Sequence, residues 1–182
     1  MFSTCVSAIN VHQVGGPVSQ YAPAMFHVVL YHPEIPPNTG NIMRLCANTD
    51  TALHLVHPLG FSLEDQLLRR AGLDYREWAD VNEHDTFDHF LATVGPRRLL
   101  AFTRNAGRVH TDAVYQAGDA LLFGPESDGL PTGVLIRPEI DDQLRIPMVA
   151  RSRSLNLSNA VAIALYEALR QNGFPSLLRE GK

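Results

Sequence analysis

Lysine is almost absent from this sequence of 182 residues, since the last residue, Lys182, is the only lysine among fifteen basic side chains. Phosphate-binding loops of the Walker type end in Lys-Ser or Lys-Thr, so the sequence excludes that nucleotide site. Neither a G-x-G-x-x-G fingerprint nor a G-x-S-x-G elbow occurs. An ordinary Rossmann cofactor site and a serine-hydrolase site are therefore not expected.

Cysteine is scarce as well, with Cys5 and Cys46 the only two. They do not form a disulfide framework, and no Cys/His spacing suits zinc, so we expect no metal. Cys46 falls on the apolar stripe of an expected helix, which favours a buried free thiol over a reactive one. No apolar run approaches the roughly 20 residues that cross a bilayer, so no membrane association is expected.

The composition, 45% hydrophobic and 19% charged, is that of a globular protein of one domain. A net charge of -4 argues against a general polyanion binder, although the arginines leave room for a local basic face. Residues 1–24 lack a basic start and a continuous apolar run, which predicts a flexible extension rather than a secretory signal. We therefore expect a cytoplasmic protein with one folded domain at 25–182.

From residue 26 onward, short apolar segments alternate with amphipathic ones. Strands are expected at 26–31, 52–56, 98–103, 120–123 and 144–146. Helices are expected where Asn38, Ser62, Asp85 and Ser158 act as caps, the last one running to Asn172 before Gly173. This order predicts an α/β fold, a mainly parallel sheet flanked by helices. Ligands bind such sheets beyond the carboxyl ends of strands, so the loops there carry the candidate site.

The first of these loops, 36–44, reads P-P-N-T-G-N-I-M-R. Asn38 and Asn41 place polar groups at a helix start, and Gly40 permits close approach of a ligand. Arg44 lies one to two turns into the helix, where it would face the same opening. A well-capped helix with a solvated arginine would explain the pattern equally well.

The second loop, 123–131, holds two glycines and two prolines in nine residues. Such a sharply bent loop exposes main-chain groups that suit a small ligand, and Glu126 offers a fixed acceptor for that ligand or for a neighbouring amide. The alternative is a plain strand-to-helix turn, with Pro131 at the first helical position.

The third loop runs from Ile146 to Asn159 and gathers two arginines, three serines and two asparagines between 151 and 159. Ser158 would cap the last helix whether or not the loop binds a ligand. The other polar groups exceed what a cap requires. Tyr166 lies about two turns into that helix, where a core role is more common than a catalytic one.

Together with L-L-R-R-A-G-L-D-Y at 67–75, the segments 36–49, 123–131 and 146–161 resemble the motifs of SPOUT methyltransferases. The resemblance is to the TrmL type, which methylates the ribose 2'-OH of the tRNA wobble nucleotide, and it covers about residues 25–178. It implies S-adenosylmethionine as cofactor, tRNA as substrate and a homodimer. It also implies a C-terminal trefoil knot, which is an exception to the rule that chains avoid knots.

The resemblance further implies roles for single residues. The cofactor contacts would be Phe102, Gly124, Ile146, Met148 and Ser154. The catalytic residues would be Arg44, Asn38 and Tyr166, with Arg44 holding the target phosphate and orienting the 2'-OH. Apart from the resemblance, our hypothesis is that Asn41, Arg69, Arg70, Arg151 and Arg153 contact the RNA, although surface arginines that merely solvate a helix are a serious alternative. Asp128 stands where relatives can carry a basic residue.

Three other functions remain open on the sequence alone. A SPOUT enzyme of this kind could act on another tRNA position or on ribosomal RNA. The fold could instead serve as a non-catalytic RNA-binding module, which the intact polar motifs argue against. An α/β enzyme could also bind another adenine-containing ligand, and a thermal shift with S-adenosylhomocysteine but not with ATP or NAD would distinguish it.

Overall fold

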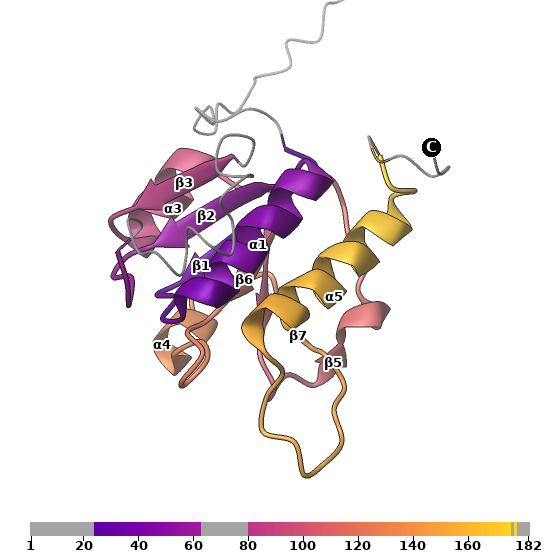
Figure 1. Cartoon of the computed structure of the whole chain (residues 1–182). Helices are drawn as coiled ribbons and strands as arrows, with labels where there is room; N and C mark the ends of the chain where they lie inside the picture. The colour runs from indigo at the N-terminus through magenta and orange to yellow at the C-terminus, as the bar shows by residue number, and fades with distance from the viewer. Residues whose placement is uncertain (1–23, 63–79, 176, 178–182) are drawn as a thin grey trace, which may run out of the picture.

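A computed structural model describes residues 24–62, 80–175 and 177. Within these residues seven parallel strands form one sheet in the order β3-β2-β1-β6-β4-β7-β5 (Figure 1). The strands are β1 (Phe26–Tyr31), β2 (Ala52–Val56), β3 (Val81–His84), β4 (Arg98–Phe102), β5 (Arg108–Val109), β6 (Asp119–Phe123) and β7 (Asp142–Arg145). The helices are α1 (Pro36–Thr49), α3 (Phe87–Val94), α4 (Thr132–Leu135) and α5 (Leu157–Gln171), with a 3-10 turn at His110–Asp112.

Helices cover both faces of the sheet, as expected for strands that are apolar throughout. Because side chains alternate along a strand, Val28 and Leu30 of β1 pack on one face while Val29 packs on the other. The first face lies under α1 and α5, which Figure 1 shows side by side. The second lies under α3 and α4. The predicted α/β fold with a parallel sheet is confirmed.

Most predicted elements lie within a residue or two of their observed bounds. The strands at 26–31 and 52–56 agree at both ends. The last helix spans Leu157–Gln171, and Gly173 takes a φ of 75° just beyond it. Cys46 is fully buried, as predicted, and burial raises the pKa of its thiol.

Short elements were missed and some caps were placed wrongly. Strands β3 and β5 have only 4 and 2 residues, too few for a periodic pattern, and the four-residue helix α4 was expected only as the alternative reading of the second loop. Thr86, not Asp85, caps α3, because its hydroxyl accepts the N–H of His89 at 3.0 Å. Pro131 is the residue before α4 rather than its first residue. The helix predicted after Ser62 lies outside the described residues.

No helix among the described residues is both long enough and apolar enough to cross a membrane.

A row of three buried histidines crosses the sheet beneath α3. Nδ1 of His27 in β1 lies 3.0 Å from Nε2 of His54 in β2, and Nδ1 of His54 lies 3.0 Å from Nε2 of His84 in β3. At each contact one nitrogen carries the proton and the other accepts it, so neutral rings satisfy the row. Burial lowers the pKa of all three, to about 4 for His84. The pKa of His54 falls to about 2, because burial and the charges of the two flanking histidines act together.

We expect this histidine row to make the fold sensitive to acid. Below about pH 6.5 the unfolded chain binds protons that the folded histidines reject, so stability is complete above that pH and falls as the pH drops towards their lowered pKa values. At pH 5.5, His54 alone would cost on the order of 1 kcal/mol, or roughly 2–4 °C of melting temperature. Thermal melts of the wild type and of His54→Gln across this range provide the test. Equal pH slopes for the two proteins would contradict the prediction.

Candidate functional site

The carboxyl ends of the parallel strands bring the three polar loops to one edge of the sheet, the lower edge in Figure 1. Leu30 at the end of β1 is in register with Phe123 at the end of β6, and Phe102 of β4 is in register with Leu144 of β7. The segments that follow these strands therefore leave the sheet as neighbours. Hydrogen bonds then join them directly.

Two glutamates join the residues just before the first loop to the second loop. The Glu126 carboxylate accepts the backbone N–H groups of Glu34 at 2.9 Å and of Ile35 at 3.3 Å. In return, the Glu34 carboxylate accepts the N–H and the hydroxyl of Ser127, both at 2.9 Å. Glu126 thus acts as the fixed acceptor for a neighbouring amide that its loop suggested. The part played by Glu34 was not foreseen, because no local pattern links positions 93 residues apart.

Helix α1 begins without a cap of its own. Pro36 and Pro37 occupy its first two positions, where an N–H would lack a partner, and the capping residue Ile35 offers no side-chain hydrogen bond. The prediction that Asn38 caps this helix is therefore wrong, since Asn38 already lies inside it. Its side chain instead donates from Nδ2 to Glu126 Oε1 at 2.9 Å.

A second amide continues this chain of hydrogen bonds into the third loop. Asn156 Nδ2 donates to Asn38 Oδ1 at 2.9 Å. Asn156 Oδ1 accepts the N–H groups of Ser158 at 3.0 Å and of Asn159 at 3.3 Å. Asn156, not Ser158, is therefore the cap of α5, and Ser158 lies in its first turn. All three polar loops meet in one hydrogen-bonded chain.

The glycine of the second loop has no room for a side chain. A Cβ at Gly124 would lie 2.3 Å from the backbone N of Leu130 and 2.4 Å from the carbonyl carbon of Gly129, far inside van der Waals contact. Gly129 itself has a φ of 72°, which favours glycine. The loop therefore folds back on its own main chain directly after β6.

The five residues expected to bind the cofactor come from the ends of β4, β6 and β7 and from the loop before α5. Phe102 is 9% exposed and stacks on Phe123 at 4.7 Å between ring centroids. Ile146 and Met148 are half-buried, while Ser154 is exposed. Apolar side chains beside open main-chain groups fit an adenosine group, which needs a hydrophobic slot and a few hydrogen bonds.

The residues expected to act on RNA differ in exposure. Asn41, Arg44, Arg151 and Arg153 are exposed on α1 and in the third loop. Tyr166 is 47% exposed on α5, so it is not a core residue, whereas Asn38 is only 6% exposed. Arg69 and Arg70, with the whole 67–75 motif, lie outside the described residues.

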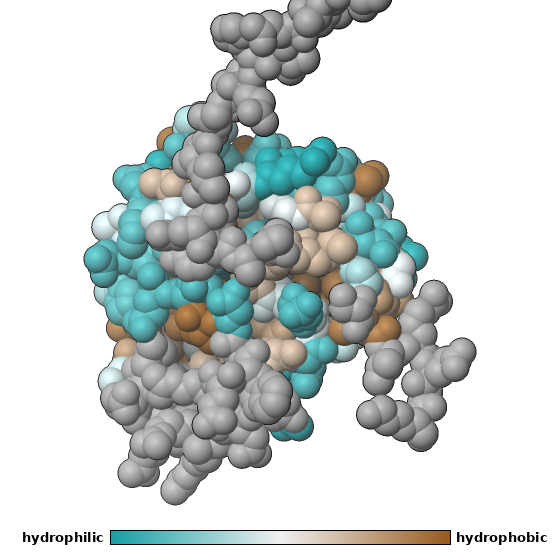
Figure 2. All heavy atoms as spheres, turned by 90° about the horizontal axis from the view of Figure 1, so that it is seen from above, coloured by the Kyte–Doolittle hydropathy of each residue, from teal (hydrophilic) through white to brown (hydrophobic). Residues whose placement is uncertain are grey.

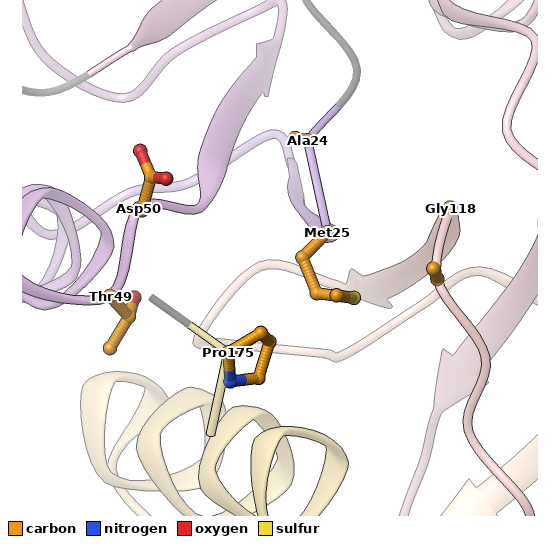
Figure 3. Close-up of a pocket in the computed structure, with 7 residues that line it drawn as sticks. Ala24, Met25, Thr49, Asp50, Gly118 and Pro175 are labelled. Carbon is orange, nitrogen blue, oxygen red and sulfur yellow. The ribbon is translucent and has the colours of Figure 1, made fainter. Parts of the chain in front are cut away.

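A separate hollow of about 480 Å³ opens at the opposite edge of the sheet. Figure 3 shows Thr49 and Asp50 from the end of α1 around it, together with Met25, Gly118 and Pro175. That edge of the molecule presents a mixture of hydrophilic and apolar residues (Figure 2). The hollow lies away from the three loops and includes none of the predicted site residues. In the described part of the chain, no group of three or more His, Cys, Asp or Glu residues could hold a metal ion.

Residues 25–166 match the SpoU rRNA Methylase family. The chain belongs to the SpoU methylase family. A relative from Escherichia coli (strain K12) is 52% identical over 157 residues, which cover 86% of this chain and 100% of the relative. That protein is a tRNA (cytidine(34)-2'-O)-methyltransferase, as is a relative from Aeromonas hydrophila with the same identity and coverage.

Solved structures agree with membership of the SpoU family. A structure concerned with 2'-OH methylation of C/U34 on tRNA has a TM-score of 0.77 at 46% identity, covering 84% of this chain and 99% of its own. The SpoU methyltransferase AviRb from Streptomyces viridochromogenes, in complex with S-adenosylmethionine, shares the fold at 22% identity and a TM-score of 0.75, covering 84% of this chain and 62% of its own. The predicted resemblance to methyltransferases of this kind is confirmed.

Proposed function

We propose that this enzyme transfers the methyl group of S-adenosylmethionine to the ribose 2'-OH of tRNA nucleotide 34, the wobble position. Relatives with this activity are 52% identical and are matched over their full length. The observation that carries the proposal is the hydrogen-bonded chain from Glu126 through Asn38 to Asn156, because it unites three of the four motifs on which the resemblance rests. If only one motif resembled the family by chance, we would not expect it to be hydrogen-bonded to the other two.

A ribose 2'-OH is a poor nucleophile at neutral pH, so the protein must align it and help to remove its proton. Bound S-adenosylmethionine supplies an electrophilic methyl group on a sulfonium centre. Arg44 would contact the RNA, because it is an exposed cation on α1, about two turns beyond the start of the helix that Glu126 holds. Since a guanidinium is almost never deprotonated, Arg44 would bind the target phosphate and orient the 2'-OH, with that phosphate sharing in proton acceptance.

Phe102, Gly124, Ile146, Met148 and Ser154 would hold the cofactor. Their position supports this assignment, because the ends of three strands and the third loop place these residues along the same edge of the sheet as Glu126. The third loop is also tied to the segment after β4, since Arg104 Nη1 donates to the carbonyl of Arg153 at 3.4 Å. A trefoil knot in this part of the chain belongs to the same proposal.

RNA would lie over the exposed polar side chains of α1 and the third loop, with Asn41, Arg151 and Arg153 contacting it and Arg69 and Arg70 assisting. Forked guanidinium groups suit phosphate oxygens. A cytoplasmic homodimer is also proposed. Exposed Ile163 and Tyr166 on α5 supply an apolar face for a second copy, and Tyr166 would then lie where the two copies and the RNA meet.

The test is a methyl-transfer assay on tRNA from cells that lack this enzyme, followed by nucleoside mass spectrometry. We expect a 2'-O-methylated cytidine or uridine that maps to position 34. Methylation at another tRNA position, or of ribosomal RNA alone, would show that the proposed substrate is wrong and would identify the actual one. Binding of S-adenosylhomocysteine without methylation of any RNA would indicate the non-catalytic module instead.

A further inference from the structure

The charge of Glu126 dictates the direction of every hydrogen bond in the chain that joins the loops. An ionised carboxylate accepts hydrogen bonds and donates none, so Asn38 must turn its NH₂ group towards Glu126. The amide oxygen of Asn38 then points the other way and requires a donor, which is the NH₂ group of Asn156. This leaves the oxygen of Asn156 facing the first N–H groups of α5, which it caps.

Because Asn38 is buried, reversing the direction of its hydrogen bonds would cost free energy. Asn38 is 6% exposed, so water cannot freely replace a lost partner, and two like groups facing each other there would remain unsatisfied. Glu126 also takes the last two N–H groups before the uncapped start of α1. One side chain therefore holds the beginning of α1 and, through two amides, the beginning of α5.

We propose that Glu126 is a positioning residue for methyl transfer. Acting through Asn38 and Asn156, it fixes the helix that carries Arg44 relative to the loop that carries Ser154. This inference rests on the proposed function. Asn38 then serves as the first link of the chain, since both ends of its amide are engaged, rather than as a group that touches the ribose. Misplacing reacting groups by about 1 Å can lower a rate by about 10²-fold, so the effect falls on kcat.

The experiment reverses the polarity of one link and then restores it. In Glu126→Gln, an amide that must also donate replaces the pure acceptor. In Asn38→Asp, two carboxylates face each other. In the double variant, the NH₂ group of Gln at 126 can donate to Asp at 38, which still accepts from Asn156, while the amide oxygen keeps the N–H of Glu34. Only the longer bond from the N–H of Ile35, at 3.3 Å, is lost. Glu139→Gln is the matched control, because Glu139 is an exposed carboxylate that pairs with Arg137 outside the three loops.

For Glu126→Gln we expect kcat for tRNA methylation to fall by about 10²-fold, while KM for tRNA and Kd for S-adenosylmethionine stay within about threefold. The double variant should exceed the kcat of Glu126→Gln by at least about tenfold, a rescue that loss of packing alone would not allow. A wild-type kcat in Glu126→Gln, or a double variant no more active than Glu126→Gln, would overturn the proposal.

A second measurement does not depend on activity. The side-chain amide NMR signals of Asn38 and Asn156 should both shift in Glu126→Gln and return towards the wild-type positions in the double variant. If the chemical shift of the Asn156 side-chain amide does not change in Glu126→Gln, Glu126 does not orient Asn156 and the proposal is overturned. If the wild type methylates no tRNA, the proposed function fails, whereas these signals still decide whether Glu126 orients both amides.

Discussion

Replacing Arg44 with alanine is expected to abolish methyl transfer to tRNA, with a fall in kcat on the order of 10³-fold. The substitution removes an exposed guanidinium from α1 and leaves the buried face of that helix intact, including Ile42, Met43 and Cys46. The fold and the strand ends that carry the cofactor candidates should therefore persist. Kd for S-adenosylmethionine, measured by calorimetry, should stay within about threefold of the wild-type value.

Two further variants show whether position and chemistry both matter. Arg97→Ala removes another exposed arginine, next to the amino end of β4 at the far edge of the sheet, and should leave kcat unchanged. Arg44→Lys keeps the charge but loses the planar fork, so it should recover only part of the activity. Full activity in Arg44→Ala would remove this residue from the reaction.

Replacing Gly124 with alanine is expected to have the second large effect, on cofactor binding. The new methyl group would meet the main chain of Gly129 and Leu130 at 2.3 to 2.4 Å, and backbone atoms cannot move aside as a flexible side chain can. The loop after β6 must therefore open. We expect Kd for S-adenosylmethionine to rise by at least about 10²-fold, and overpacking of about 1–3 kcal/mol to lower the melting temperature.

Gly133→Ala provides the matched control, because a Cβ at this position in α4 meets nothing within 4 Å. It should leave cofactor affinity and melting temperature close to their wild-type values. Calorimetric titration and thermal melts of the two variants measure both effects. Wild-type affinity in Gly124→Ala would mean that the bend of this loop does not shape the cofactor site.

The sequence predicted the sheet well wherever a strand is apolar throughout. Strands β1 and β2 bury almost every residue, so continuous apolar runs revealed them. Strand β3, Val-Asn-Glu-His, carries polar side chains at an edge of the sheet and gives no such signal. The three loops were also located correctly, because parallel strands place their carboxyl ends together.

The partners of the site residues could not be predicted in the same way. Rules for helix caps consider the nearest few residues, and by those rules Asn38 and Ser158 were reasonable caps. The structure instead supplies the start of α1 with Glu126, which lies 91 residues beyond Ile35. Asn156 caps α5 and also reaches back 118 residues to Asn38. Such pairings depend on how the sheet assembles, so the local sequence pattern does not predict them.

The strand order has a consequence for the synthesis of this protein on the ribosome. Strand β1 pairs with β2, its neighbour in sequence, but its other partner is β6, in a register that joins Phe26 to Asp119. One edge of β1 therefore stays open until more than half of the chain has been translated. Contacts of such long range slow folding and leave apolar edges exposed to aggregation. We expect nascent chains that stop before residue 119 to need protection by chaperones, a need that ends once β6 enters the sheet.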